Sequence, residues 1–148
     1  MRLWVGLKIA VFTALAILLG LGVFTFIYAR GGSYFSDDPK ACVNCHIMND
    51  VYNSWSRSSH QAVATCNACH VPHDIIGKWL SKARNGFNHS VAFTLQNFSE
   101  PIRITELNRQ ILQTNCIDCH SVIVSEIVHE ANADLVCFMC HRGVGHGP

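Results

Sequence analysis

All eight cysteines of the chain fall in pairs that are separated by two residues and followed directly by histidine. The four motifs are Cys42, Cys45 and His46; Cys66, Cys69 and His70; Cys116, Cys119 and His120; and Cys137, Cys140 and His141. Two thiols at this spacing reach the two vinyl groups of one haem, and the adjacent imidazole can bind its iron. The pattern therefore predicts four covalently bound haem c groups.

Disulfide bridges and zinc ribbons also use paired cysteines at this spacing. Neither explains a histidine after every pair. With 9 histidines in 148 residues, four such placements would arise by chance with a probability on the order of 10⁻⁵, so the motif favours haem attachment.

Each haem iron takes up to two axial ligands, and bis-histidine or histidine–methionine ligation suits electron transfer. The histidines outside the four motifs are His60, His73, His89, His129 and His146. These are five candidates for four distal positions, and counting alone does not assign them.

The haem motifs must be positioned relative to a membrane, because residues 9–29 form an uncharged apolar run of 21 residues. A helix of this length crosses a hydrocarbon core. A cleaved signal has a shorter apolar stretch, and the rest of the chain is too short to bury a helix that is apolar on every side. We expect an anchor in residues 1–30 and a haem-binding domain in residues 31–148.

The haem-binding domain carries 8 Lys plus Arg and 10 Asp plus Glu, a balance of −2. It has no basic stripe and no glycine-rich phosphate loop, which argues against nucleic acid as a partner. Because about 120 residues would share four large macrocycles, the haems should form the core. We expect a mainly α-helical fold with much irregular structure.

The spacing of the motifs suggests two dihaem modules. The first cysteines of successive motifs are 24, 50 and 21 residues apart. The long step contains a basic, amphipathic segment at residues 75–98, in which Gly86 is expected to interrupt the helix. Its apolar side could lie on a membrane surface or pack against haem, and periodicity does not distinguish the two.

An N-terminal anchor, four motifs in this order, the sequence CHIM at the first motif and SKARNGFNHSVAFTL before the third together resemble the NapC/NirT family of membrane-anchored tetrahaem cytochromes. The resemblance covers nearly the whole chain. It is strongest to the small members that serve the ammonia-forming nitrite reductase. Haem attachment outside the cytoplasm, which this class implies, places the N-terminus inside and the haem domain in the periplasm.

The resemblance also implies axial ligands. It gives the first haem Met48 in place of His46, although spacing alone leaves Met48 as a packing residue. It pairs His60 with His141 at the fourth haem and His146 with His120 at the third. The second haem, on His70, would receive a lysine from the partner enzyme. His73 lies too close to His70 to cross to the opposite haem face, and His129 matches no family position.

The activity implied by the resemblance is oxidation of menaquinol, with electrons passed to a periplasmic multihaem reductase, most simply the pentahaem nitrite reductase, that the protein also anchors. Lys82 and His89 would form the quinol pocket, because a histidine can exchange protons at neutral pH. His89 could instead cap the iron of the first haem, and the sequence does not distinguish the two roles. Some relatives carry aspartate where this chain has His89.

Two other functions are compatible with the sequence. The same quinol oxidation could feed another periplasmic enzyme, or the protein could be an electron relay and anchor without a quinol site. It does not resemble the nitrite reductase itself, whose catalytic motif carries a lysine, since all four motifs here are ordinary. A small-xxx-small pattern at Ala16 and Gly20 leaves the stoichiometry open, because it is frequent by chance.

Overall fold

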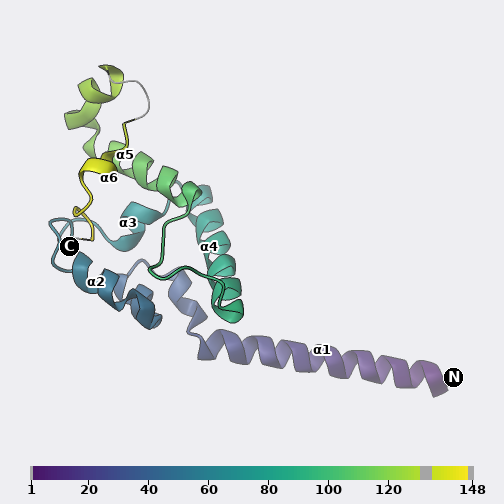
Figure 1. Cartoon of the computed structure of the whole chain (residues 1–148). Helices are drawn as coiled ribbons and strands as arrows, with labels where there is room; N and C mark the ends of the chain where they lie inside the picture. The colour runs from purple at the N-terminus through teal and green to yellow at the C-terminus, as the bar shows by residue number, and fades with distance from the viewer. Residues whose placement is uncertain (1, 131–134, 147–148) are drawn as a thin grey trace. The chain divides into compact units, whose positions relative to one another are not determined.

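The computed structural model describes residues 2–130 and 135–146, without the side chains of residues 127–130. Every regular element in this part of the chain is helical, as Figure 1 shows. The expected mainly α-helical fold is therefore confirmed. The chain divides into two compact units, Met1–Ser36 and Asp37–Pro148.

The first unit consists of α1 (Arg2–Tyr28) and the short 3-10 helix η1 (Gly31–Phe35). The 27 residues of α1 have a mean hydropathy of 2.5, and none of its side chains is buried. A helix that exposes apolar residues on every side is stable only in an apolar solvent. Length, composition and exposure all agree with the predicted membrane anchor.

All four haem-attachment motifs lie in the second unit, on its helices or directly beside them. Its elements are η2 (Pro39–Asn44), η3 (His46–Met48), α2 (Asn49–Trp55), α3 (Cys66–His70), α4 (Ile75–Leu95), α5 (Glu106–Glu130) and α6 (Cys137–Cys140). Local capping fixes several of their ends. Thr65 accepts a hydrogen bond from Ala68 N at the start of α3, and Asp74 does the same for Gly77 N at the start of α4.

The expected interruption at Gly86 is wrong, because α4 continues from Ile75 to Leu95. A glycine in a helix interior costs only about 1 kcal/mol relative to alanine. Here the carbonyl of Gly86 also accepts a hydrogen bond from the Ser90 hydroxyl at 2.8 Å. The continuous helix matters for function because it places Lys82 and His89 on one face, two turns apart.

The hydrophobic core of the second unit is very small. Among the described side chains, only Trp55 and Val71 are buried hydrophobic residues. The Trp55 indole donates a hydrogen bond to Ala64 O at 3.1 Å and so ties the loop after α2 to that helix. A unit of this size needs far more buried apolar surface than two side chains supply. The missing core is what bound haem would provide.

Candidate haem and quinol sites

The first motif lies on η2 and η3, and its two candidate ligands differ in exposure. Asp38 starts η2 by accepting a hydrogen bond from Lys40 N at 2.9 Å. His46, directly after Cys45, is exposed, whereas Met48 is half-buried. The partial burial of Met48 is compatible with its expected role at the first haem.

The first and second motifs contact each other through their leading cysteines. The Cys42 and Cys66 thiols are hydrogen-bonded, which lowers the pKa of Cys42 to about 7 and raises that of Cys66. These free thiols stand in for the thioether sulfurs of the haem-loaded protein. Their contact places the first two attachment points side by side.

The second and third motifs are joined by a buried amide. Asn115, which precedes Cys116 on α5, is 4% exposed and donates hydrogen bonds to Cys69 O at 3.0 Å and Val71 O at 2.9 Å. A second bridge runs through His73, whose Nε2 lies 2.9 Å from Ala68 O and whose Nδ1 lies 3.9 Å from an Asp118 oxygen. The end of α3 is therefore fixed to α5.

The third and fourth motifs are joined by a second amide. Gln113 accepts a hydrogen bond from Cys137 N at 2.9 Å and donates to Leu135 O at 3.0 Å. Its amide nitrogen also lies 3.3 Å from the Cys137 sulfur. Burial, with the Cys137 thiol nearby, raises the pKa of Cys116.

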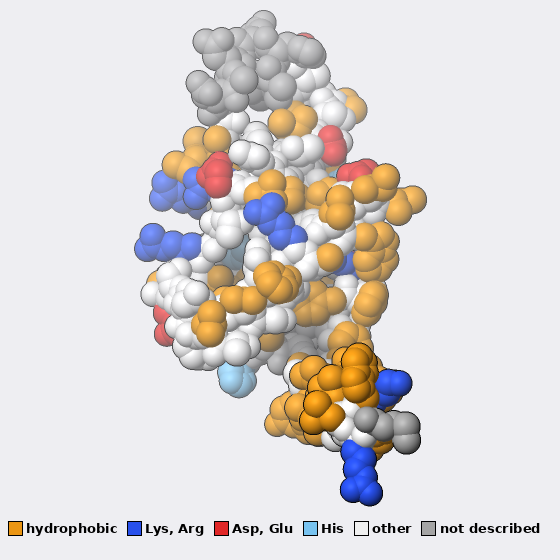
Figure 2. Space-filling model, turned by 90° about the vertical axis from the view of Figure 1, so that its right-hand side faces the viewer, with side chains coloured by type: hydrophobic (Ala, Val, Ile, Leu, Met, Phe, Trp, Pro, Cys, Tyr) orange, Lys and Arg blue, Asp and Glu red, His pale blue; other side chains and the backbone are white. Residues whose placement is uncertain are grey.

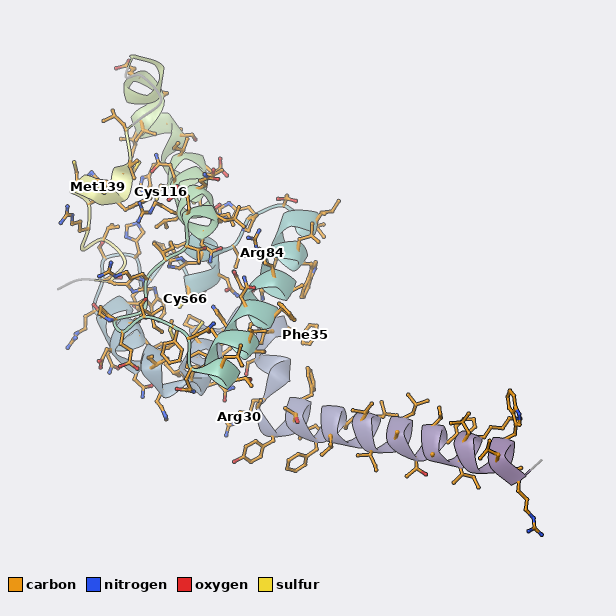
Figure 3. All side chains as sticks on the ribbon, turned by 45° about the vertical axis from the view of Figure 1, so that its right-hand side comes forward. Arg30, Phe35, Cys66, Arg84, Cys116 and Met139 are labelled. Carbon is orange, nitrogen blue, oxygen red and sulfur yellow. The ribbon has the colours of Figure 1, made fainter. Side chains whose placement is uncertain are left out.

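Each motif thus contacts the next one in sequence order. Figure 3 shows Cys66 and Cys116 within the folded body, with Met139 of the fourth motif at its outer side. The 50-residue insert does not separate the halves of this unit, because α3 packs on α5. An unbroken row of neighbouring cofactor sites is the arrangement that stepwise electron transfer needs.

Four histidines form two close pairs. The ring centroids of His60 and His120 lie 6.1 Å apart, and those of His70 and His146 lie 5.8 Å apart. The fold thus gathers histidines from distant parts of the chain next to the attachment motifs. The axial pairs that the resemblance implies, His60 with His141 and His146 with His120, stay predictions.

These residues fit haem. The eight cysteines are unpaired, so every thiol pair is available for attachment. Imidazoles lie near the attachment motifs in two close pairs, and His146 lines an open cavity of about 580 Å³ beside α2. No ring contact in the described part of the chain pairs His141 with a second imidazole. The side chain of His129 lies outside the described residues.

The polar face of α4 is built around Asp37. This carboxylate accepts hydrogen bonds from Lys78 Nζ, from Lys82 Nζ at 2.9 Å and from Asn67 Nδ2 at 2.7 Å. These donors, Lys78 first, hold the pKa of Asp37 well below its usual range. Lys82 is only 7% exposed, and its ammonium also lies 5.6 Å from the centre of the Trp79 ring.

His89 lies two turns after Lys82 on the same helix. Neighbouring side chains partly desolvate its imidazole and lower its pKa, although the residue remains at the surface. Desolvation disfavours the imidazolium, so His89 stays neutral at neutral pH and can accept a proton. Lys82, held by Asp37, is a donor and a fixed positive charge. The two residues therefore differ in chemistry.

The opposite face of α4 is apolar and exposed. Its side chains follow helical spacing and are Ile76, Leu80, Phe87, Val91 and Leu95. Figure 2 shows exposed hydrophobic side chains spread over this side of the folded body. The positive charge of Lys82 contributes to the lowered pKa of the Cys42 thiol, so one attachment point of the first motif lies near the polar face.

Sequence reasoning missed three residues of this arrangement, Asp37, Gln113 and Asn115. Each acts through contacts with residues more than 20 positions away, which no local pattern reports. One signal was available: Asn115 stands directly before Cys116 within a helix, where asparagine has poor intrinsic propensity. Such a residue in a helix interior often has a specific partner.

Comparisons with known proteins agree on one family. Residues 5–148 match the family described as NapC/NirT cytochrome c family, N-terminal region. The chain is 40% identical over 144 residues to the cytochrome c-type protein NrfH of Wolinella succinogenes, covering 89% of this chain and 81% of the relative. It is 31% identical over 126 residues to the cytochrome c nitrite reductase subunit NrfH of Nitratidesulfovibrio vulgaris, covering 85% and 78%.

A solved structure also matches. A chain in the crystal structure of the cytochrome c nitrite reductase NrfHA complex, bound to the inhibitor HQNO, superposes with a TM-score of 0.68 at 32% identity. The match covers 88% of this chain and 90% of the other.

Proposed function

The chain belongs to the NapC/NirT cytochrome c family and is therefore a membrane-anchored c-type cytochrome. We propose that it is the quinol dehydrogenase subunit of a cytochrome c nitrite reductase complex. One observation carries the proposal: the attachment motifs contact one another in sequence order within a chain that also has a membrane-spanning helix. The names of the two relatives, and the complex in the solved structure, support nitrite reductase as the partner.

We propose four haems with the following ligands. Met48 serves the first haem. His70 serves the second, with a lysine of the partner enzyme on its distal side. His120 with His146 serves the third, and His141 with His60 serves the fourth. When bound, each haem supplies a one-electron redox centre whose potential depends on its axial ligands.

This assignment leaves the second haem as the one that the partner enzyme completes. A lysine of the reductase on the distal side of the haem on His70 would make this haem the exit for electrons.

The pairing predicts a specific ligand change. Replacing His146 or His60 with alanine should remove one distal imidazole and convert one haem from low spin to high spin, with the haem content unchanged. Electron paramagnetic resonance of the oxidised protein would detect the loss of one low-spin signal in each variant. His73→Ala is the matched control, since this exposed histidine bonds to backbone and Asp118. Unchanged low-spin signals in His146→Ala would contradict the pairing.

The quinol site is proposed on the polar face of α4, next to the first two motifs. His89 would accept a proton from a quinol hydroxyl, and Lys82 would orient the molecule while Asp37 holds the ammonium in place. Oxidation of one menaquinol releases two protons and two electrons, and each electron leaves singly along the row of sites. Asp37 is a poor proton acceptor because its pKa is lowered.

The apolar face of α4 would lie on the lipid surface. A helix with one apolar face and basic residues on the other is typical of an interfacial segment. This would bring the quinol site to the place where a lipid-soluble substrate is available. With the N-terminus in the cytoplasm, the surface in question is the periplasmic side of the inner membrane.

Stopped-flow mixing of the haem-loaded protein with a menaquinol analogue tests the proposed function. We expect reduction of haem within the time of a catalytic turnover, with two electrons taken up per quinol. A protein that stays oxidised with quinol, yet is reduced by a small-molecule donor such as dithionite, would be a relay or anchor without a quinol site. Transfer from the reduced protein to purified nitrite reductase, compared with other multihaem enzymes, would identify the acceptor.

A further inference from the structure

We propose that Gln113 and Asn115 are positioning residues, which hold the fourth and second haem-binding motifs against the third. The two amides lie three positions and one position before Cys116, the first cysteine of the third motif, on α5. They set the relative placement of three cofactor sites from one helix. The inference rests on the proposed haem ligation and adds the residues that maintain it.

Asn115 fixes the peptides on either side of His70. Its amide nitrogen donates to Cys69 O and to Val71 O, the carbonyls that precede and follow this ligand. Both carbonyls lie at the C-terminal end of α3, where helical partners are lacking. Since the side chain is 4% exposed, an apolar replacement would leave buried carbonyls without a donor.

Gln113 fixes the start of the fourth motif. It accepts from Cys137 N and donates to Leu135 O, so both ends of the amide are used on the segment that enters α6. The free Cys137 sulfur, 3.3 Å from the amide nitrogen, stands in for the thioether of the loaded protein. This contact brings Gln113 next to the covalent link of the fourth haem.

The two amides reach opposite ways from α5. Residues two positions apart on a helix are about 200° apart around its axis. The second motif and the fourth motif are therefore held on opposite sides of the helix that carries the third. Because hydrogen bonds hold the second and fourth motifs to this rigid helix, the orientation and spacing of the ligands are fixed. Contacts of this kind outside the iron ligands tune a metal site.

Spectroscopy and potentiometry of the haem-loaded full chain test the proposal. In Asn115→Leu, we expect a shift of the haem signal that is altered in a His70→Met reference, and about a tenfold change in the reduction equilibrium of that one haem, which is 59 mV for one electron. In Gln113→Met, the changed signal should be the one altered in a His141→Met reference. Gln113→Glu, which keeps the acceptor for Cys137 N, should be closer to wild type.

Asn108→Leu is the matched control. Asn108 lies on the same helix but donates to Asn85 on α4 and touches no motif, so its signals should match wild type. Equal changes in all haems, or in the control, would overturn the positioning role and leave a general packing role. If Asn115→Leu does not accumulate with four haems, Asn115→Ser is measured by the same criterion.

Failure of this inference is separable from failure of the proposed ligation. If a His70→Met reference changes no haem signal, the proposed ligation of the second haem is wrong. If it changes one signal but Asn115→Leu and Asn115→Ser leave that signal and its potential unmoved, only the positioning role is overturned.

Discussion

Replacing His89 with asparagine is expected to slow reduction of the protein by quinol about 10²-fold, with haem content and low-spin spectra unchanged. The physical reason is loss of a proton acceptor, since a positioned general base contributes about 10²- to 10⁴-fold. Stopped-flow reduction by a menaquinol analogue, followed at the haem absorption band, measures the effect. Asn88→Ala, at an exposed site on the same helix, controls for disturbance of α4.

The role of His89 also predicts how the rate of reduction by quinol changes with pH. Desolvation lowers the pKa of His89, so the imidazole is neutral and active down to a pH below about 6.5, its usual value. The rate should fall as the pH drops through that lowered pKa. The charged groups near this face are Lys82 and Asp37, which form an ion pair two helical turns away from His89. His89→Asp should keep a base and extend activity to lower pH, since the usual carboxyl pKa is about 3.9.

A pH profile of His89→Asn that still falls at acidic pH, at a nearly wild-type rate, would remove His89 from the proton path. Reduction by dithionite should be equally fast in all variants, because it needs no proton acceptor on the protein. This comparison separates a defect in the quinol reaction from a defect in the haems.

The second large effect concerns folding. The full chain produced without haem attachment is expected to show no cooperative unfolding of residues 37–148, a loss of essentially all of the roughly 5–15 kcal/mol typical of a domain. Only Trp55 and Val71 are buried hydrophobic residues among the described side chains, so the polypeptide lacks a core of its own. Circular dichroism and denaturant titration in detergent, with and without haem, measure this.

Helical signal should survive in the haem-free chain, because α1 folds in detergent without the rest. A single-motif variant, Cys116→Ser with Cys119→Ser, should fall between the two extremes. Cooperative unfolding of the haem-free second unit at a midpoint close to that of the loaded protein would contradict the view that haem is the core.

The sequence predicted the parts of this protein that are local. Fixed spacing identified the four attachment motifs, and an uninterrupted apolar run identified α1. Family membership, which the comparisons establish, followed from motif order. The haem count, the ligands and the quinol residues remain proposals, but each was named from the sequence.

The sequence did not predict features that depend on long-range contacts. The break expected at Gly86 was wrong because the intrinsic cost of one glycine is small and packing decides the outcome. The histidine pairs depend on how distant segments meet: His60 and His120 are 60 residues apart in the chain, and His70 and His146 are 76 apart. Asp37, Gln113 and Asn115 were missed for the same reason.

The uniform surface of α1 has a consequence for assembly. Because this helix is apolar on every side and buries no residue, lipid solvates all of its orientations equally. Rotation of the anchor about its long axis therefore has no preferred angle of its own. Contacts of other segments or of partners must therefore set the rotation of the protein about the membrane normal. The anchor itself fixes only the depth of the protein in the bilayer.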